Sequence, residues 1–418
     1  MPSYIIEGGR KLEGEVDVSG SKNASLPIMA ATILNSGITR LYNIPNIRDT
    51  KITQEILRFL GCKVKRNSGK IEINSKNVNR KEIPEHLMHQ MRSTVILAGA
   101  LLGRFKEAKF SYPGGCDIGA RPIDLHLDSF KKLGINITEE GGFILCKCDK
   151  IVGANIDLDF PSVGATENII LASVHAEGTT KITNAAMEPE IVDLANCLNK
   201  MGAKIIGAGT NVIQITGVRK LKDISYTVMP DRIETGTLLC MAAVTGGKIK
   251  LNKVEPSHIS PVLNKLRECG CKIEENTHSI YLEAPKKIKS VDIKTMPYPG
   301  FPTDMQSVFA SMLTTAKGTS MIIENIFENR YRYIPELKRM GAKASIEGKT
   351  AVITGVRKLS GTTVKSTDLR GGAALVTAGL AAKGKTTITD IQYILRGYEN
   401  LDEKLRCLGA NIYQEEGE

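Results

Sequence analysis

One cysteine in a glycine-rich segment has the strongest potential for chemistry. Cys116 lies in the segment Tyr112-Pro113-Gly114-Gly115-Cys116-Asp117-Ile118-Gly119-Ala120-Arg121-Pro122. The glycines predict a mobile loop whose backbone can approach a ligand closely, and Arg121 can supply a positive charge that favours the thiolate. Asp117 would oppose the thiolate if it turned inward, but a place at the loop tip favours solvation. We interpret Cys116 as a candidate acid, base or nucleophile.

Several basic residues stand where they could bind an anion. Lys22 follows Gly20-Ser21, where a strand pattern changes to a helix pattern, and the backbone N–H groups at a helix start favour anions. Arg92, Arg121 and Arg396 carry planar guanidinium groups, which bind carboxylates and phosphates well. The alternative is a solvated Lys22 beside an ordinary helix cap, with solvated or salt-bridged arginines at the surface.

Polar residues mark other predicted helix starts. Asp304 follows Pro302-Thr303, where a carboxylate either caps the helix or serves acid–base chemistry. Asp231 and Glu234 occupy the matching place in the preceding repeat, and we interpret both as structural caps. The small residues between Phe160 and Thr166 form a turn entering a helix, whose amides and hydroxyls suit a diphosphate.

Bulk properties limit the classes of function. The 418 residues suffice for two or more sizeable domains, and 42% hydrophobic and 24% charged residues are ordinary for a globular protein. Without an apolar run of roughly 20 residues or a signal pattern, we expect no membrane association and a cytoplasmic location. Nine scattered cysteines suit reduced thiols and predict no metal site. The net charge of +11 fits an anionic partner, but 5% aromatic residues and no Trp disfavour nucleic acid.

The chain repeats itself six times, at intervals of about 70 residues. Each repeat has an amphipathic helical pattern that ends at a glycine, which predicts a helix C-cap followed by a strand. These glycines are Gly61, Gly134, Gly202, Gly270, Gly341 and Gly409. Each repeat also has a helix that is apolar nearly all round, such as residues 26–34 or 373–380, and such a helix is normally buried. The pattern predicts an α/β protein, and the period is too long for common solenoids.

Seven segments in order along the chain resemble the family of UDP-N-acetylglucosamine 1-carboxyvinyltransferases, which are enolpyruvyl transferases. The segments span residues 20–24, the Cys116 loop through His126, 230–236, 301–306, 327–330, 367–370 and 396–399. The resemblance implies a two-domain inside-out α/β barrel of six repeats, with sheets outside and helices inside. Domain one would span 20–229, domain two would combine 1–19 and 230–418, and the active site would lie in the cleft between them.

The resemblance also implies a reaction: enolpyruvate moves from phosphoenolpyruvate to the 3-hydroxyl of UDP-N-acetylglucosamine, and phosphate is released. This is the first committed step of peptidoglycan synthesis, on which cell shape and cell division depend. The implied catalytic residues are Cys116, Asp304, Lys22 and Arg396. No metal, organic cofactor, nucleic acid or membrane takes part, and the implied inhibitor is fosfomycin, which alkylates the thiol.

Further roles come from the same resemblance. Lys22, Arg121 and Arg396 would bind phosphoenolpyruvate, and Asn23 and Asp304 the amino sugar. Ser162, Val163 and Gly164 would hold the diphosphate, although some relatives have a lysine where Phe160 stands. The uracil would lie against Arg121, Pro122, Ile123, Asp124 and Leu125. Arg92, Ile326, Arg330, Asp368 and Arg370 complete the substrate-binding set. His126 is interpreted as structural or hydrogen-bonded.

Three alternatives stay open. The shikimate-pathway enolpyruvyl transferase shares the fold and the phosphoenolpyruvate chemistry but not the cysteine loop. The +11 charge would fit an RNA-binding or RNA-end-processing protein, whose binding would be strong and salt-sensitive. A non-catalytic paralogue, or one with a different acceptor, is the third, and the presence of Lys22, Arg121, Asp304, Asp368 and Arg396 argues against a non-catalytic one.

Overall fold

The computed structural model describes residues 2–67, 69–114, 119 and 123–416. These residues divide into two compact units. The first unit contains residues 20–114 and 123–229, and the second contains residues 2–19, 119 and 230–416. Apart from Gly119, which groups with the second unit, the chain passes between the units after Ser19 and again after Met229. Cys116, Asp117, Arg121 and Pro122 lie outside the described residues.

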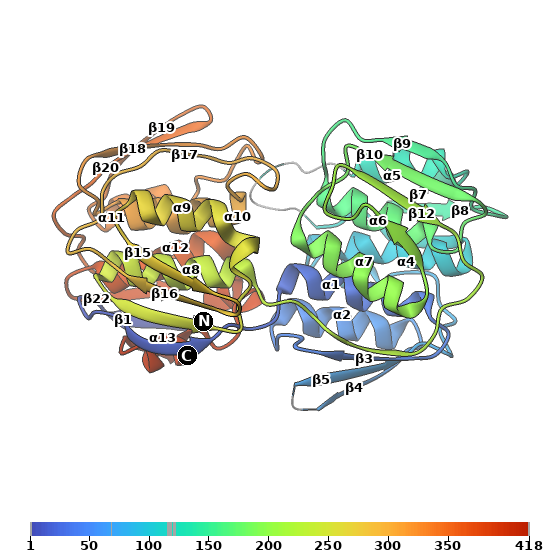
Figure 1. Ribbon diagram of the computed structural model, residues 1–418, viewed down its shortest axis with the longest axis horizontal. Coiled ribbons are helices and arrows are strands. Elements are labelled where there is room, and N and C mark those ends of the chain that lie inside the picture. Colours follow the sequence, from blue (N-terminus) through green and yellow to red (C-terminus); the bar gives the residue numbers. More distant parts are fainter. Residues whose placement is uncertain (1, 68, 115–118, 120–122, 417–418) are drawn as a thin grey trace. The chain divides into compact units, whose positions relative to one another are not determined.

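Three sheets form the outside of the first unit (Figure 1). Two have four strands, in which one parallel pair adjoins an antiparallel hairpin. The third has three described strands, and a single parallel bridge between Glu82 and Lys109 stands beside its edge strand. The strand orders are β13 (Ile224–Thr227), β3 (Ile38–Tyr42), β5 (Lys70–Asn74), β4 (Lys63–Asn67); β6 (Glu107–Ser111), β8 (Phe143–Lys147), β7 (Asn136–Glu140); and β11 (Lys204–Ile206), β12 (Val212–Thr216), β10 (Thr179–Thr183), β9 (Asn155–Asp157).

The N-terminal strands complete two of the sheets of the second unit. β1 (Ser3–Glu7) is antiparallel to both β22 (Lys385–Thr389) and β23 (Asn411–Glu415), so Tyr4 pairs with Ile388 and with Gln414. β2 (Glu13–Asp17) is parallel to β14 (Lys248–Asn252). The strand orders are β21 (Thr363–Lys365), β22, β1, β23; β15 (Lys272–Asn276), β16 (Ser279–Glu283), β14, β2; and β17 (Ile293–Lys294), β18 (Thr319–Ile323), β20 (Thr350–Thr354), β19 (Lys343–Glu347).

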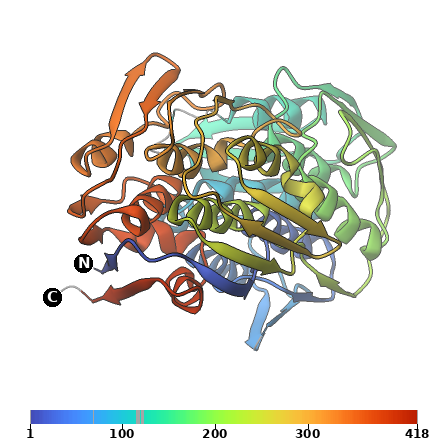
Figure 2. The same cartoon turned by 60° about the vertical axis from the view of Figure 1, so that its left-hand side comes forward.

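Three apolar helices lie inside each unit, between its sheets (Figures 1 and 2). They are buried on nearly every side because they have no polar face. In α12, for example, the hydrophobic residues from Ala373 to Ala378 are 0% exposed. The inner helices are α1 (Lys22–Ala31), α4 (Ile96–Phe105) and α6 (Val163–Ser173) in the first unit, and α8 (Arg232–Thr245), α10 (Thr303–Leu313) and α12 (Leu369–Ala381) in the second. This arrangement confirms the inside-out α/β fold, built here from separate sheets.

The amphipathic helices end where the sequence predicts. All six repeat glycines adopt positive φ, from 83° at Gly134 to 107° at Gly61, a conformation that glycine adopts without a steric cost. The helices before them are α2 (Arg48–Phe59), α5 (Asp124–Lys132), α7 (Pro189–Met201), α9 (Ser260–Glu268), α11 (Ile334–Arg339) and α13 (Leu401–Cys407). Shorter helices are α3 (Glu85–Met88), η1 (Thr32–Leu34), η2 (Arg92–Val95), η3 (Pro256–Ile259) and η4 (Ile391–Arg396).

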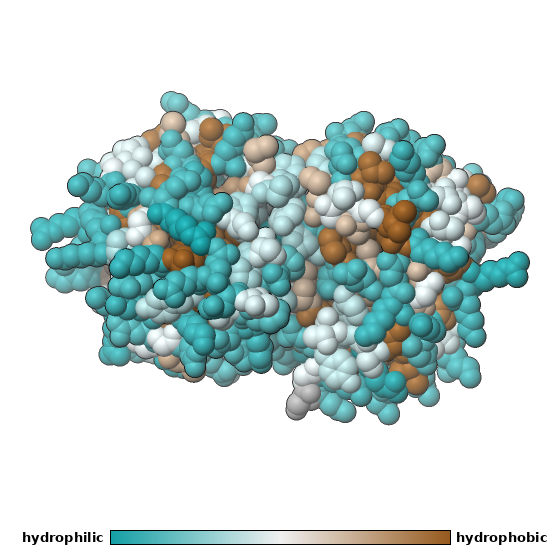
Figure 3. Space-filling view, viewed as in Figure 1, coloured by the Kyte–Doolittle hydropathy of each residue, from teal (hydrophilic) through white to brown (hydrophobic). Residues whose placement is uncertain are grey.

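The surface is mostly hydrophilic on the face shown in Figure 3, with apolar residues in small groups. None of the helices among the described residues combines the length and the apolar character that a membrane span requires. The described cysteines are all free thiols, and among them Cys407 alone is exposed.

Candidate active site

The sequence-predicted residues of the first unit lie at or next to the starts of helices. Lys22 is the first residue of α1, whose cap is Ser21. Its ammonium nitrogen lies 3.1 Å from Oδ2 of Asp49, which is 1% exposed in its side chain and belongs to the first turn of α2. The Lys22 side chain is 14% exposed. The buried carboxylate of Asp49 therefore fixes the position of a cation near the surface. Sequence reasoning missed Asp49, because its partner lies on another helix.

The other predicted residues of this unit occupy similar places. Ser162 caps α6, and its hydroxyl oxygen accepts a hydrogen bond from Ala165 N at 3.3 Å. Arg92 begins η2, and Asp124 and Leu125 begin α5, directly after the buried Ile123. Asn23, Val163 and Gly164 lie in the first turns of α1 and α6. Helix starts present backbone N–H groups and a partial positive charge, which suits anionic ligands.

His126 is a hydrogen-bonded residue of the interior, as the sequence reasoning predicts. Its Nδ1 lies 2.7 Å from the amide nitrogen of Asn168, which also donates to Val95 O at 3.1 Å. Asn168 Oδ1 accepts from Gly99 N at 2.8 Å, so this amide joins α4 to α6. A Cβ atom at Gly164 would lie 3.1 Å from the His126 ring. His126 therefore packs against the start of α6.

In the second unit, Asp304 is held between two arginines. Its Oδ1 accepts a hydrogen bond from Arg330 Nη2 at 2.8 Å, and its Oδ2 accepts one from Arg370 Nη2 at 2.9 Å. The arginine side chains are 3% and 5% exposed, whereas the Asp304 side chain is 27% exposed. Burial by itself would lower the pKa of Arg370, but nearby Asp304, Tyr398 and Asp231 raise that pKa above its ordinary value. The result is a fixed carboxylate whose side chain is partly exposed.

The alternative that Asp304 caps its helix is wrong. Pro302 occupies the cap position of α10, no side chain caps this helix, and Asp304 lies two residues further along. In the neighbouring repeats a carboxylate does cap the helix: Asp231 accepts from Ile233 N and Glu234 N, and Asp368 accepts from Arg370 N and Gly371 N. Asp304 instead binds two guanidinium groups.

The interpretation of Asp231 as a cap is thus confirmed, and the same interpretation of Glu234 is wrong. Glu234 forms an ion pair with Lys404 and accepts from Ser19 N at 3.3 Å. Burial raises the pKa of Glu234 to about 7, against the influence of Lys404. Glu234 therefore anchors the segment at Ser19 instead of a helix end.

A buried carboxylate that the sequence reasoning missed supports the predicted residue Ile326. Glu324 is 2% exposed, and its Oε1 accepts from Ile326 N at 2.8 Å and from Phe327 N at 3.2 Å. Its Oε2 accepts from the hydroxyl of Thr303, the first residue of α10, at 3.0 Å. Glu324 thus ties the turn at Ile326 to the helix that carries Asp304.

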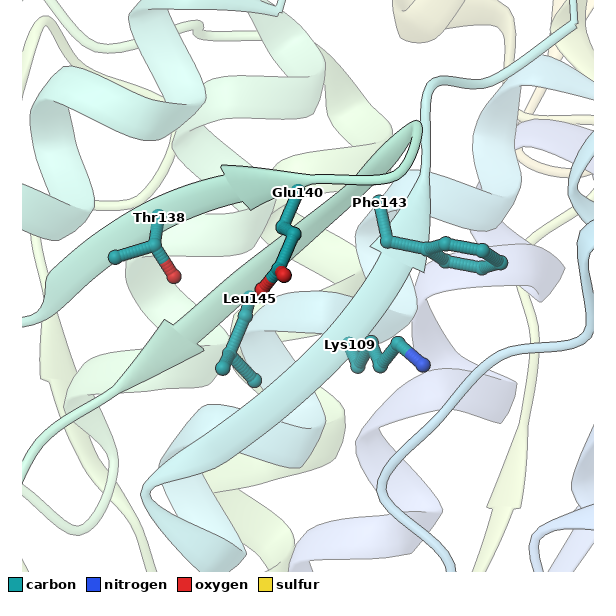
Figure 4. A pocket seen from close by; sticks show the side chains of 5 residues that line it. All are labelled: Lys109, Thr138, Glu140, Phe143 and Leu145. Carbon is teal, nitrogen blue, oxygen red and sulfur yellow. The ribbon is translucent and has the colours of Figure 1, made fainter.

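The remaining predicted residues do not lie at helix starts that the structure describes. Arg396 is the last residue of η4 and is half-buried. Cys116, Arg121 and Pro122 fall outside the described residues. One pocket formed by the described residues lies elsewhere, on the outer face of the β6–β8–β7 sheet (Figure 4). It has a volume of about 190 Å³, and its lining residues, Lys109, Thr138, Glu140, Phe143 and Leu145, include none of the predicted site residues.

Comparisons with known proteins agree with this fold. The family model described as EPSP synthase (3-phosphoshikimate 1-carboxyvinyltransferase) matches residues 6–405. The chain is 51% identical over 413 residues to UDP-N-acetylglucosamine 1-carboxyvinyltransferase 2 of Caldanaerobacter subterraneus subsp. tengcongensis, covering 99% of each chain. It is 47% identical over 414 residues to UDP-N-acetylglucosamine 1-carboxyvinyltransferase of Clostridium botulinum, again covering 99% of each chain.

Solved structures point the same way. The enolpyruvyl transferase NikO from Streptomyces tendae matches with a TM-score of 0.89 at 25% identity, covering 99% of this chain and 98% of that one. EPSP synthase from Acinetobacter baumannii matches with a TM-score of 0.77 at 18% identity over 100% of both chains, which shows the shared fold. The fold and the site thus define an enolpyruvyl transferase. The chain belongs to the EPSP synthase family and, within it, to the UDP-N-acetylglucosamine 1-carboxyvinyltransferases.

Proposed function

We propose that this protein transfers the enolpyruvyl group of phosphoenolpyruvate to the 3-hydroxyl of UDP-N-acetylglucosamine and releases phosphate. The observation that carries the proposal is the Asp304 carboxylate, which two buried arginines hold at the start of α10 while it stays partly exposed. A carboxylate in this state can orient a hydroxyl group or accept its proton. The near-full-length relatives named for this activity support the choice of substrates.

The proposed reaction has two steps. The sugar 3-hydroxyl loses its proton and its oxygen bonds to C2 of phosphoenolpyruvate, while C3 gains a proton. The tetrahedral intermediate then loses phosphate from C2 and a proton from C3, which restores the double bond. Asp304 orients the hydroxyl or takes its proton, and Cys116 donates the proton to C3 or aids product release.

Fixed cations stabilise the charges of the donor. Lys22, Arg121 and Arg396 bind the carboxylate and the phosphate of phosphoenolpyruvate. The buried Asp49 carboxylate holds Lys22 in place before the ligand arrives, so little reorganisation is needed during the reaction. This is electrostatic preorganisation, and in this proposal it needs no metal or organic cofactor.

The remaining residues bind the sugar nucleotide. Asn23 and Asp304 contact the amino sugar, the start of α6 at Ser162, Val163 and Gly164 holds the diphosphate, and the segment 121–125 borders the uracil. Arg330 and Arg370 act by holding Asp304. Arg92, Ile326 and Asp368 complete the set. In this proposal, residues 20–229 form one domain, residues 1–19 and 230–418 form the other, and both contribute to a single active site.

The proposed cellular role follows from the reaction. The product is committed to peptidoglycan synthesis, so the enzyme acts in the cytoplasm and supports cell shape and division. Fosfomycin inhibits it by alkylating Cys116.

The direct test mixes the purified protein with phosphoenolpyruvate and UDP-N-acetylglucosamine and measures phosphate release, omitting each substrate in turn. Release that requires both substrates supports the proposal. A folded protein that binds the ligands but releases no phosphate contradicts it, and would favour a different acceptor or a non-catalytic role.

A further inference from the structure

A buried tyrosine lies against Arg370, one of the two arginines that hold Asp304. Tyr398 is 2% exposed, and the centre of its ring lies 5.4 Å from Cζ of Arg370. Its hydroxyl lies 3.0 Å from that of Thr237, which is 0% exposed on α8, and either group can donate. Burial raises the pKa of Tyr398, so the phenol stays neutral. The ring is therefore fixed at one end by a hydrogen bond and presents its face to a cation.

These contacts form a chain that ends at the reacting carboxylate. Thr237 lies on α8, Arg370 on α12 and Asp304 on α10, so the chain connects all three inner helices of the second unit. Arg370 Nη2 donates to Asp304 Oδ2 at 2.9 Å. Asp304, with 27% of its side chain exposed, is the open end of the chain. A shift of the Tyr398 ring would thus be passed to Asp304 through Arg370.

The backbone near Tyr398 is packed against the same helix. A Cβ atom at Gly397 would lie 2.5 Å from Leu369 Cδ1, and one at Gly372 would lie 2.5 Å from Ile394 Cγ1. The absence of side chains at these glycines lets η4 and its end approach α12 closely. Arg396 lies two residues before Tyr398, so its backbone is held by the same contacts.

We propose that Tyr398 is a positioning residue, which fixes Arg370 and thereby Asp304, and which also holds the segment that carries Arg396. The inference rests on the proposed function, because it assigns the acceptor hydroxyl to Asp304 and phosphoenolpyruvate to Arg396. Tyr398 itself touches neither substrate. It determines where the groups that do touch them stand.

A double-mutant cycle tests the hydroxyl pair. Tyr398→Phe and Thr237→Val both remove the hydrogen bond between the two hydroxyls, and Tyr398→Phe also removes the interaction of the phenol oxygen with Arg370. Tyr398→Phe should lower kcat about fivefold, Thr237→Val should lower it by no more than that, and the double variant should be no slower than Tyr398→Phe. Tyr398→Leu, which also removes the ring, should lower kcat about 50-fold. The KM for UDP-N-acetylglucosamine should stay within about twofold of the wild-type value, and that for phosphoenolpyruvate should rise through Arg396.

A matched control separates positioning from stability. Tyr226 also donates a hydrogen bond, to Asp193 Oδ1 at 2.6 Å, but it is only partly buried and lies in the first unit. Tyr226→Phe should lower the urea midpoint of unfolding about as much as Tyr398→Phe and leave kcat unchanged. Single variants with wild-type kcat, a double variant with the product of the single losses, or an equal loss of kcat in Tyr226→Phe would each overturn the proposal.

A second double-mutant cycle tests the contact between Tyr398 and Arg370 through protein stability, without measuring turnover. Tyr398→Leu and Arg370→Met, alone and together, should shift the unfolding midpoint non-additively, because each removes one side of the same contact. Additive shifts would overturn the proposal. If the wild-type protein releases no phosphate, the proposed function fails, and this cycle still decides whether Tyr398 holds Arg370. Arg370→Lys replaces Arg370→Met if the latter does not fold.

Discussion

The ammonium group of Lys22 and the carboxylate of Asp49 form an ion pair of 3.1 Å between the starts of two helices, α1 and α2. Asp49 is fully buried, whereas Lys22 reaches the surface. A buried charge is costly unless it is paired, so Asp49 and Lys22 hold each other in one place. An anion that binds Lys22 meets a cation whose position is already set.

The first prediction concerns this pair. Asp49→Asn should raise the KM for phosphoenolpyruvate about tenfold or more, because Lys22 loses its fixed position, and should lower the free energy of unfolding by about 3 kcal/mol. Steady-state kinetics and urea denaturation measure both effects. The control is Glu72→Gln, which removes a partly exposed ion pair with Arg40 and should change neither by much. A wild-type KM for Asp49→Asn would show that Lys22 needs no such support.

The second prediction concerns Asp304. Asp304→Asn should lower kcat by about 100-fold or more, because the amide can neither accept the hydroxyl proton nor balance Arg330 and Arg370. If Asp304 acted only as a helix cap, Asn would replace it well and turnover would persist. Asp292→Asn serves as the control, since Asp292 accepts a hydrogen bond from Met321 N on an exposed edge. Turnover is followed by phosphate release.

The third prediction separates Cys116 from the other thiols. Fosfomycin should add covalently to Cys116 and not to Cys407, the exposed thiol of α13, because exposure alone does not make a cysteine reactive. Peptide mass spectrometry locates the addition. Cys116→Asp should be protected, and Cys407→Ser should react like the wild type. Labelling at another cysteine would refute the assignment.

Loss of turnover tests the same residue independently. Cys116→Ala should nearly abolish phosphate release while leaving the binding of UDP-N-acetylglucosamine largely intact, since the thiol acts on the donor. Calorimetric titration with the sugar nucleotide provides the binding measurement. Near-normal turnover would remove Cys116 from the mechanism.

The fourth prediction concerns stability and pH. Burial raises the pKa of Asp193 from 3.8 to about 6, although Tyr226 and Met229 N donate hydrogen bonds to its carboxylate. The folded chain therefore holds this proton at a higher pH than the unfolded chain does. The contribution of Asp193 to the free energy of unfolding is fully present below the pKa of this group in the unfolded chain, and it is lost as the pH rises through about 6.

Asp193→Asn should remove this dependence. Relative to the variant, the wild-type protein should lose about 2 kcal/mol of unfolding free energy between pH 4 and pH 7. Urea denaturation at several pH values measures the difference. Asp128→Asn changes an exposed carboxylate and should follow the wild-type curve. Parallel curves for wild type and Asp193→Asn would contradict the prediction.

Much of the fold could be predicted because its signals are local. The six glycines take positive φ because the chain must turn sharply after each amphipathic helix, and only neighbouring residues decide that. The apolar helices lie inside for an equally local reason, since they have no polar face. The pairing of β1 with β22 and β23 could not be read from these patterns, because it joins residues about 400 positions apart.

The candidate site divides in the same way. The types and spacing of residues predict anion binding at helix starts and chemistry at Cys116, and the family resemblance predicts a role for Asp304. Tertiary structure alone decided that Asp304 binds Arg330 and Arg370 instead of capping α10, that Asp49 holds Lys22, and that Glu234 pairs with Lys404. The physical reason is that capping and turns depend on residues a few positions apart, whereas the partner of a buried charge is whichever group the packing of distant helices brings within hydrogen-bonding distance.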